Sequence, residues 1–159
     1  MTEQEPDVLA HAPVDCDVDL HMPAARAELR WPVLAAISAG GVCGALARYG
    51  ISAAWPHQAG GFPWATFVVN VTGCLLIGVL MVVVTEVVTG RPLLRPFLGV
   101  GVLGGYTTFS TYVVDIQRTA GAGAAAVALA YLAATLVGAL VAVWAGTTLT
   151  RAALSGGHR

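Results

Sequence analysis

Four long apolar stretches, separated by short polar segments, dominate the pattern of the chain. They cover residues 32–54, 63–88, 96–116 and 122–149. At about 1.5 Å of rise per residue, helices of these lengths cross the roughly 30 Å hydrocarbon core of a bilayer, some of them with tilt. The composition, 57% hydrophobic and 11% charged, agrees. The pattern therefore predicts an all-α membrane protein with four transmembrane helices.

The segments between the apolar stretches are short, at residues 56–62, 89–95 and 117–121. Connections of this length make consecutive helices antiparallel neighbours. We therefore expect an up-down-up-down set of helices whose two ends lie on one side of the membrane.

Small residues recur every four positions in three of the stretches, which is the pattern of tight helix pairing in membranes. They are Ala36, Gly40 and Gly44, then Gly101 and Gly105, then Ala134, Gly138, Ala142 and Gly146. We expect these faces to pack against neighbouring helices, a prediction about packing and not about function.

The ends of the chain differ in kind from its middle, so three segments are predicted. Residues 1–30 are rich in acidic residues and prolines and are expected to form a disordered tail. Residues 31–151 form the transmembrane domain, and residues 152–159 a short C-terminal tail. A secretory signal would begin with a basic region and a short apolar core, which this start lacks, so the first span is expected to stay in the protein.

The basic residues are unevenly distributed over the two sides of the predicted helix set. Six of them flank one side and two the other, and the positive-inside rule then places both termini in the cytoplasm. The six are Arg26, Arg30, Arg91, Arg95, Arg151 and Arg159, and the two are Arg118 and Arg48.

The third stretch contains an interruption where a membrane helix should be apolar. Residues 104–111 hold two adjacent glycines and four hydroxyl residues other than tyrosine. Such a run weakens a helix and leaves backbone carbonyls without partners, which survives at bilayer depth only inside protein or beside a hydrated path. We expect the third helix to be broken near its middle.

Few polar residues lie inside the other stretches. Asn70 lies midway in the second and Arg48 late in the first, while Tyr131 and Thr135 share one face of the fourth. Each also has a purely structural interpretation. Asn70 would hydrogen-bond between helices, Arg48 would extend its charge to the membrane surface, and Tyr131 and Thr135 would pack against a neighbouring helix. We expect no carboxylate in the middle of any span and an arginine as the only deep charge. That expectation argues against proton-coupled or cation transport, and hydrogen-bond donors with aromatic ring edges suit a small anion.

Other chemistries find little support in the sequence. The three cysteines have no metal-like spacing, and no histidine lies inside a span, so a side-chain metal site or an intramembrane hydrolase is not expected. A G-x-G-x-x-G pattern at residues 99–104 has no strand before it and no suitably placed acidic residue after it. We expect neither nucleotide nor nucleic-acid binding, and no enzymatic activity.

Three segments together resemble one family, the CrcB or Fluc fluoride channels. They are GGVCGALARY at residues 40–49, TFVVNVTG at residues 66–73 and GGYTTFSTY at residues 104–112, of which the last is the most specific. The resemblance covers about residues 32–150, in the right order and spacing, and leaves the acidic tail outside it.

The resemblance implies a passive fluoride channel of the bacterial inner membrane that exports fluoride and lowers its cytoplasmic concentration. It implies an antiparallel dual-topology dimer in membrane lipid, with two pores at the interface. A structural sodium ion would lie between the subunits, held by main-chain carbonyls of Gly104 and Thr107. Arg48 would lie at a pore mouth or in a structural hydrogen-bond network. The implied pore-lining positions are Asn70, Phe109, Ser110, Thr111, Tyr112, Tyr131 and Thr135.

Tyr112 departs from the family pattern, which has a phenylalanine there. Tyrosine keeps the ring edge and adds a hydroxyl, so we expect conduction to persist while its rate or anion selectivity changes. Because the charge bias favours one orientation, the partner is either a second copy or an oppositely oriented homologue. Two other classes remain open: a small four-helix drug-proton antiporter, which would need an embedded glutamate, and a non-transporting membrane scaffold.

Overall fold

The computed structural model describes residues 31–88 and 91–156. The predicted acidic tail, residues 1–30, lies outside the described residues, and so do residues 89–90 and 157–159. The first described helix begins at Trp31, next to the start of the first predicted membrane stretch.

The described residues are all helical apart from their connections. Four segments are long and apolar enough to cross a membrane, Trp31–Ala54, Trp64–Val87, Pro96–Gly121 and Ala125–Gly156, which confirms the predicted fold class and number of spans. The first is α2 (Trp31–Ala54), and the second is α3 (Trp64–Val82) with its π-helical end η2 (Val83–Val87). The third consists of the π-helical η3 (Pro96–Leu103), α4 (Gly104–Tyr106) and α5 (Ser110–Gly121). The fourth is α6 (Ala125–Gly156).

The last connection differs from the prediction. Residues 117–121 were expected to form it, but α5 continues through Gly121 and the turn comes just before α6. Two backbone bonds end α5, from Ala122 N–H to the Arg118 carbonyl and from Gly123 N–H to the Ala120 carbonyl, each 3.0 Å. Gly123 has a φ of +82°, which glycine adopts without steric cost. Helix α5 therefore includes the polar residues that were expected to form the connection, and the turn at Gly123 follows its end.

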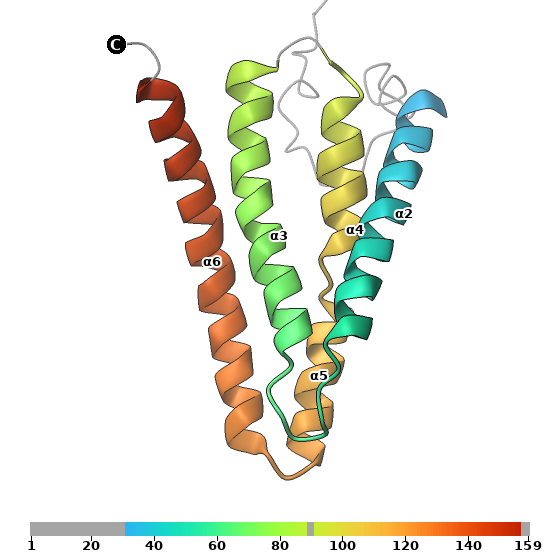
Figure 1. Ribbon diagram of the computed structural model, residues 1–159, viewed down its shortest axis with the longest axis vertical. Helices are drawn as coiled ribbons and strands as arrows, with labels where there is room; N and C mark the ends of the chain where they lie inside the picture. The colour runs from blue at the N-terminus through green and yellow to red at the C-terminus, as the bar shows by residue number, and fades with distance from the viewer. Residues whose placement is uncertain (1–30, 89–90, 157–159) are drawn as a thin grey trace, which may run out of the picture. The chain divides into compact units, whose positions relative to one another are not determined.

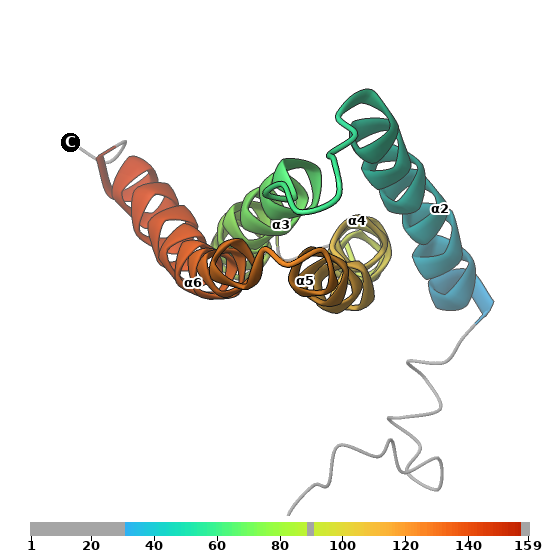
Figure 2. The ribbon, with the colours of Figure 1, turned by 90° about the horizontal axis from the view of Figure 1, so that it is seen from below.

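Consecutive spans alternate in direction, and the start of α2 and the end of α6 lie at the same end of the set (Figure 1). Helix α6 packs against α3 and α5, while α2 packs against η3 and α4. Seen from below, α2 and α6 stand on opposite sides, with the other helices between them (Figure 2). The helices thus form an open row and not a closed four-helix bundle.

The small-residue faces bring two pairs of helices into backbone contact, as the sequence predicted. A Cβ at Gly40 would meet the backbone of Phe97 and Gly101, so α2 and η3 touch at this point. A Cβ at Gly146 would meet the backbone of α3 near Gly78. Glycines are required at these positions because the helix axes come closer than a side chain permits.

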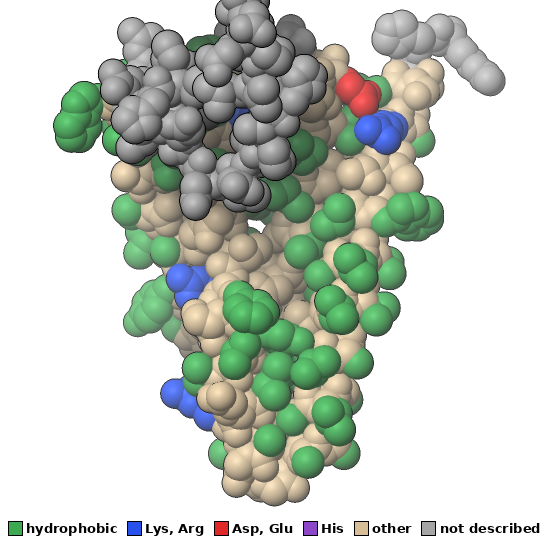
Figure 3. All heavy atoms as spheres, turned by 180° about the vertical axis from the view of Figure 1, so that it is seen from behind, with side chains coloured by type: hydrophobic (Ala, Val, Ile, Leu, Met, Phe, Trp, Pro, Cys, Tyr) green, Lys and Arg blue, Asp and Glu red, His purple; other side chains and the backbone are tan. Residues whose placement is uncertain are grey.

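Most of the apolar surface of the four spans is not covered by the chain itself. The buried share of each span's most apolar window lies between 11% and 28%. Hydrophobic side chains accordingly spread over the face shown in Figure 3, with few charged groups among them. A surface of this composition is matched to lipid or to another helical chain.

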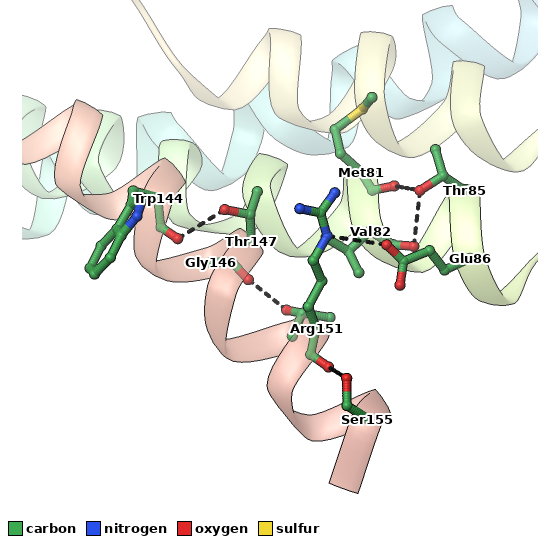
Figure 4. A network of polar contacts seen from close by, with 10 residues as sticks. Met81, Val82, Thr85, Glu86, Trp144, Gly146, Thr147, Arg151 and Ser155 are labelled. Carbon is green, nitrogen blue, oxygen red and sulfur yellow. Dashed lines mark hydrogen bonds and ion pairs between the residues drawn. The ribbon is translucent and has the colours of Figure 1, made fainter. Parts of the chain in front are cut away.

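An ion pair joins the end of α6 to η2. Arg151 Nε lies 3.2 Å from Glu86 Oε1, and the two side chains are 67% and 42% exposed (Figure 4). Around it, Thr85 and Ser155 donate to carbonyls of their own helices, those of Met81 and Arg151. An ion pair this exposed contributes at most about 1 kcal/mol, so helix packing, and not this contact, holds α6 in place.

Candidate functional site

The third span is helical on both sides of a three-residue segment that is not. Helix α4 ends at Tyr106, and the next residue, Thr107, has φ −77° and ψ 159°, an extended conformation. Helix α5 begins at Ser110. The segment 107–109 therefore exposes backbone groups that a continuous helix would bond internally.

Asn70 of α3 binds the backbone of this segment at two points. Its Nδ2 donates to the Thr108 carbonyl and its Oδ1 accepts from the Thr108 N–H, both at 2.9 Å. A polar side chain in an apolar span is costly unless it is paired, and the backbone groups of Thr108 face the same cost. Each therefore satisfies the other, which explains how both persist within a span.

Hydroxyl groups stabilise the start of α5. Thr108 Oγ1 accepts from the Thr111 N–H at 3.2 Å and donates to Thr111 Oγ1 at 3.0 Å. This arrangement satisfies one of the N–H groups that have no partner in the first turn of a helix. The hydroxyl run that marks the sequence is thus used in part to restart the helix.

The carbonyls of Gly104 and Thr107 lose the donors that a continuous helix would give them. The Thr108 N–H, four residues after Gly104, donates to Asn70, and the Thr111 N–H, four residues after Thr107, donates to Thr108 Oγ1. Gly104 is exposed, and apart from its chain neighbours and its own helix backbone, no described atom lies within 4 Å of where its side chain would begin. Oxygen dipoles of this kind are ligands that a hard cation accepts, so both residues fit a main-chain cation site.

A cavity of about 300 Å³ lies beside the interrupted segment. It combines donor groups with apolar wall, and the exposed ring of Phe109, 77% accessible, stands at it. Among the residues that the structure describes, no carboxylate lines it. The lining residues are Asn70, Cys74, Thr107, Thr108, Phe109, Tyr112, Thr135, Leu136 and Ala139.

Aromatic rings continue from this cavity into the protein. The ring centroids of Phe109 and Tyr112 are 6.0 Å apart, and those of Tyr112 and Tyr131 are 5.2 Å apart. Phe62 closes the series, 5.2 Å from Tyr131 in an edge-on arrangement. Tyr112 also donates its hydroxyl to the Leu132 carbonyl of α6 at 3.0 Å. The rings therefore connect an exposed phenylalanine to the buried contact between α3, α5 and α6.

Two buried hydroxyl groups have no hydrogen-bond partner within the described part of the chain. They belong to Tyr131, which is fully buried, and to Thr135, which is 6% exposed. The sequence predicted that the two share a helical face, and both lie on the buried side of α6. A buried hydroxyl without a partner is uncommon, and water or a ligand ordinarily supplies one. Thr135 lines the cavity, where such a partner has access.

Arg48 lies away from the cavity and contacts the third span instead. Its Nε donates to the Gly105 carbonyl at 3.2 Å, and the side chain is half-buried. The contact ties α2 to α4 at the turn before the interruption. Of the two alternatives given for Arg48, this geometry matches the structural hydrogen bond.

Asp115 and Thr66 form a buried pair that the sequence interpretation missed. Thr66 Oγ1 donates to Asp115 Oδ2 at 2.7 Å, and the residues are 5% and 2% exposed. The expectation that an arginine is the only deep charge is therefore wrong. Asp115 lies one residue before the end of the predicted stretch 96–116, but α5 continues for six residues beyond Asp115, to Gly121. Its spacing of three from Tyr112 was the available signal, because that spacing puts both on one helical face.

The sequence of the chain also matches a known protein family. The family model described as "CrcB-like protein, Camphor Resistance (CrcB)" matches residues 35–147, which include the second and third spans in full and the first and fourth in part. The chain belongs to the CrcB family.

Relatives of this CrcB-family chain carry a functional name. It is 57% identical over 116 residues to "Fluoride-specific ion channel FluC 2" of Streptomyces avermitilis, covering 70% of this chain and 73% of the relative. It is 54% identical over 123 residues to "Fluoride-specific ion channel FluC 1" of Streptomyces coelicolor, covering 77% and 80%. A FluC 2 of Nocardia farcinica is 54% identical over 137 residues, covering 86% and 98%. These relatives are named ion channels and not enzymes, and the chain is a multi-pass membrane protein.

In this CrcB-family chain the cavity brings together four of the residues singled out from the sequence as pore-lining: Asn70, Phe109, Tyr112 and Thr135. Ser110 and Thr111 stand at the start of α5 and Tyr131 lies behind Tyr112, so these three are neighbours of the cavity and not among its lining residues. Cys74, which the sequence gave no functional role, is part of the wall.

Proposed function

We propose that this chain is a passive, fluoride-selective channel that exports fluoride and lowers its cytoplasmic concentration. The observation that carries the proposal is the identity of 54–57% to relatives named fluoride-specific ion channels, over 70–86% of this chain. The cavity beside the interrupted third span gives that proposal a physical basis in this chain.

The polar groups at the cavity are suited to a small anion. Asn70 uses one N–H of its amide on Thr108 and keeps the second, and the Thr135 hydroxyl has no partner within the described residues. Phe109 adds a ring whose edge carries partial positive charge. Fluoride gives up its water only for donors that approach closely, and it meets no carboxylate among the lining residues.

Passive conduction suffices to remove fluoride from a cell. Hydrogen fluoride crosses lipid as a neutral acid and releases its proton inside, and the resulting anion cannot return through the hydrocarbon core. A selective pore lets the inside-negative potential, worth about 2.3 kcal/mol per charge per 100 mV, drive the anion out. No coupled ion is required.

We propose a dimer of two oppositely oriented subunits that conducts only when assembled, with a sodium ion between them. The apolar surface left uncovered by the chain supports a partner, and the freed carbonyls of Gly104 and Thr107 are the oxygen ligands we assign to sodium. A bound cation would neutralise the dipoles that point out of the interruption. The sodium is structural in this proposal and does not move through the pore.

The partner is a second copy or an oppositely oriented homologue, and the membrane is the bacterial inner membrane. The bias of the arginines favours one orientation, with both termini in the cytoplasm. Crosslinking of the chain expressed alone distinguishes these partners: an active homodimer inserted both ways contradicts a fixed orientation, and an inactive monomer supports a homologous partner.

Fluoride efflux from liposomes tests the function. Liposomes that contain the purified protein and are loaded with fluoride should release it when a potassium ionophore relieves the charge build-up, and should retain chloride. The absence of fluoride release, or an equal chloride release, overturns the channel proposal for the homodimer. Co-reconstitution with an oppositely oriented homologue then tests the heterodimer.

Asp115 makes proton coupling the second candidate, because a buried carboxylate is what an antiporter needs. The two mechanisms differ in what drives transport. A channel passes fluoride only when charge can be compensated, so omission of the potassium ionophore should stop efflux. If an imposed pH gradient drives fluoride against its own gradient, the protein is a proton-coupled carrier and the channel proposal is wrong.

A further inference from the structure

Tyr112 is held at both ends. Its ring belongs to the cavity wall and lies 6.0 Å from Phe109 and 5.2 Å from Tyr131, measured between ring centroids. Its hydroxyl donates to the Leu132 carbonyl at 3.0 Å, which links α5 to α6 directly. A phenylalanine at this position would make the ring contacts and lack the link.

The hydroxyl of Tyr112 is already in use. A phenol has a single proton to donate, and here the proton goes to the backbone of α6. An anion in the cavity therefore receives no hydrogen bond from Tyr112 unless the link to Leu132 breaks. Donors that remain for it among the lining residues include the second amide N–H of Asn70 and the hydroxyl of Thr135, which has no partner within the described residues.

We propose that Tyr112 is a positioning residue for ion selectivity, whose hydroxyl anchors the cavity wall and does not bind the ion. The inference rests on the proposed fluoride conduction. The anchor fixes the ring of Tyr112, and the contact between the two rings limits the positions open to the exposed ring of Phe109. A wall that holds its position favours fluoride over larger anions, because widening it to admit them requires the hydrogen bond to break.

The substitution Tyr112→Phe tests the anchor while keeping the ring. We expect fluoride efflux to change by about three- to tenfold, the factor that corresponds to one uncharged hydrogen bond, and the fluoride-over-chloride ratio to fall. Tyr49→Phe is the matched control, because Tyr49 lies on α2, is 72% exposed and has no hydrogen-bond partner in the described residues. It should leave both quantities unchanged.

Restoring a hydrogen-bond donor at position 112 distinguishes the loss of the hydrogen bond from a change in side-chain packing. p-Aminophenylalanine at position 112 has an N–H where tyrosine has its hydroxyl, and it should recover most of the lost selectivity. Wild-type rate and selectivity in Tyr112→Phe overturn the inference, and so does a loss that p-aminophenylalanine does not recover.

Fluorine NMR distinguishes an anchor from an ion ligand without measuring transport. The chain has four tyrosines, so 3-fluorotyrosine gives four signals, and Tyr112→Phe identifies that of Tyr112. The difference in this signal between H2O and D2O reports the hydrogen bond of the hydroxyl, and we expect it to be the same with and without added fluoride, with chloride as the control. A change in that isotope difference that saturates with fluoride means that the hydroxyl binds the anion and overturns the inference. A wild-type protein without fluoride efflux would instead contradict the proposed function, independently of the NMR result.

Discussion

Asn70 and Thr108 exchange two hydrogen bonds, each of 2.9 Å, between the side chain of one span and the backbone of another. The exchange takes both main-chain polar groups of Thr108 out of the helical pattern and satisfies the amide of Asn70 within a span. One side chain thus stabilises the interruption and also lines the cavity. Structural and functional roles cannot be separated at Asn70 by removing the side chain.

Asn70→Asp separates these roles in part, because aspartate still accepts from the Thr108 N–H but donates nothing to the carbonyl. We expect fluoride efflux to fall about tenfold to a hundredfold. Leaving a buried polar group without its partner costs about 1–3 kcal/mol, each 1.4 kcal/mol is about tenfold, and the added negative charge repels the anion. Gln117→Glu makes the same chemical change on the exposed side of α5 and should leave efflux unchanged. Wild-type efflux in Asn70→Asp means that the path lies elsewhere.

Phe109→Ile should impair conduction without affecting the fold. The ring is 77% exposed, so its loss should change the free energy of unfolding of the chain by less than about 0.5 kcal/mol. Loss of the ring edge should reduce fluoride efflux about two- to tenfold. Efflux and thermal unfolding are measured on the same preparation. Tyr49→Ile, at a similarly exposed ring on α2, serves as the control, and equal effects of the two substitutions would remove Phe109 from the path.

Gly40→Ala should destabilise the packing of α2 on η3. The added methyl group meets the backbone of Phe97 and Gly101, which cannot move aside as a flexible side chain does. We expect the free energy of unfolding, measured by circular dichroism in denaturant, to fall by about 1–3 kcal/mol. Gly50→Ala, in the same helix with open space around it, should be neutral or stabilising by up to about 1 kcal/mol. Equal stabilities of the two variants would show that α2 and η3 are not in backbone contact.

A double-mutant cycle measures the buried pair of Thr66 and Asp115. Thr66→Val removes the donor and leaves the Asp115 carboxyl oxygen unpaired, so we expect a destabilisation of about 1–3 kcal/mol. Combined with Asp115→Leu, which removes the acceptor as well, it should cost less than the sum of the single changes, by about 0.5–3 kcal/mol. Thr85→Val, at an exposed threonine bonded within its own helix, should cost less than about 0.5 kcal/mol. Additive effects of Thr66→Val and Asp115→Leu would show that the pair does not interact.

The spans and their packing faces could be predicted from the sequence because both depend on local patterns. Hydrophobic runs fix where a helix crosses lipid, and glycines four residues apart mark a close approach, as Gly40 and Gly101 confirm. The end of α5 could not be predicted in this way. Its last turn is polar, and Thr119 is buried there by other helices.

The candidate site was predictable as a set of residue types and not as a set of contacts. A run of hydroxyl residues beside two glycines marked the third span, but which partner each hydroxyl chooses depends on the neighbouring helix. Tyr112 illustrates this, because the sequence provides a hydroxyl and the packing of α5 on α6 assigns it to the Leu132 carbonyl.

By itself, the sequence determined three properties of the protein. It is a helical membrane protein with four spans, its small-residue faces allow close helix packing, and it contains the motifs of its family. The tertiary structure decided that Asn70 pairs with Thr108, that Arg48 bonds to Gly105, and that Asp115 is buried against Thr66. The physical reason is the range of each effect. Transfer into lipid acts on each residue along the chain, whereas a hydrogen bond inside a span exists only when two distant segments meet.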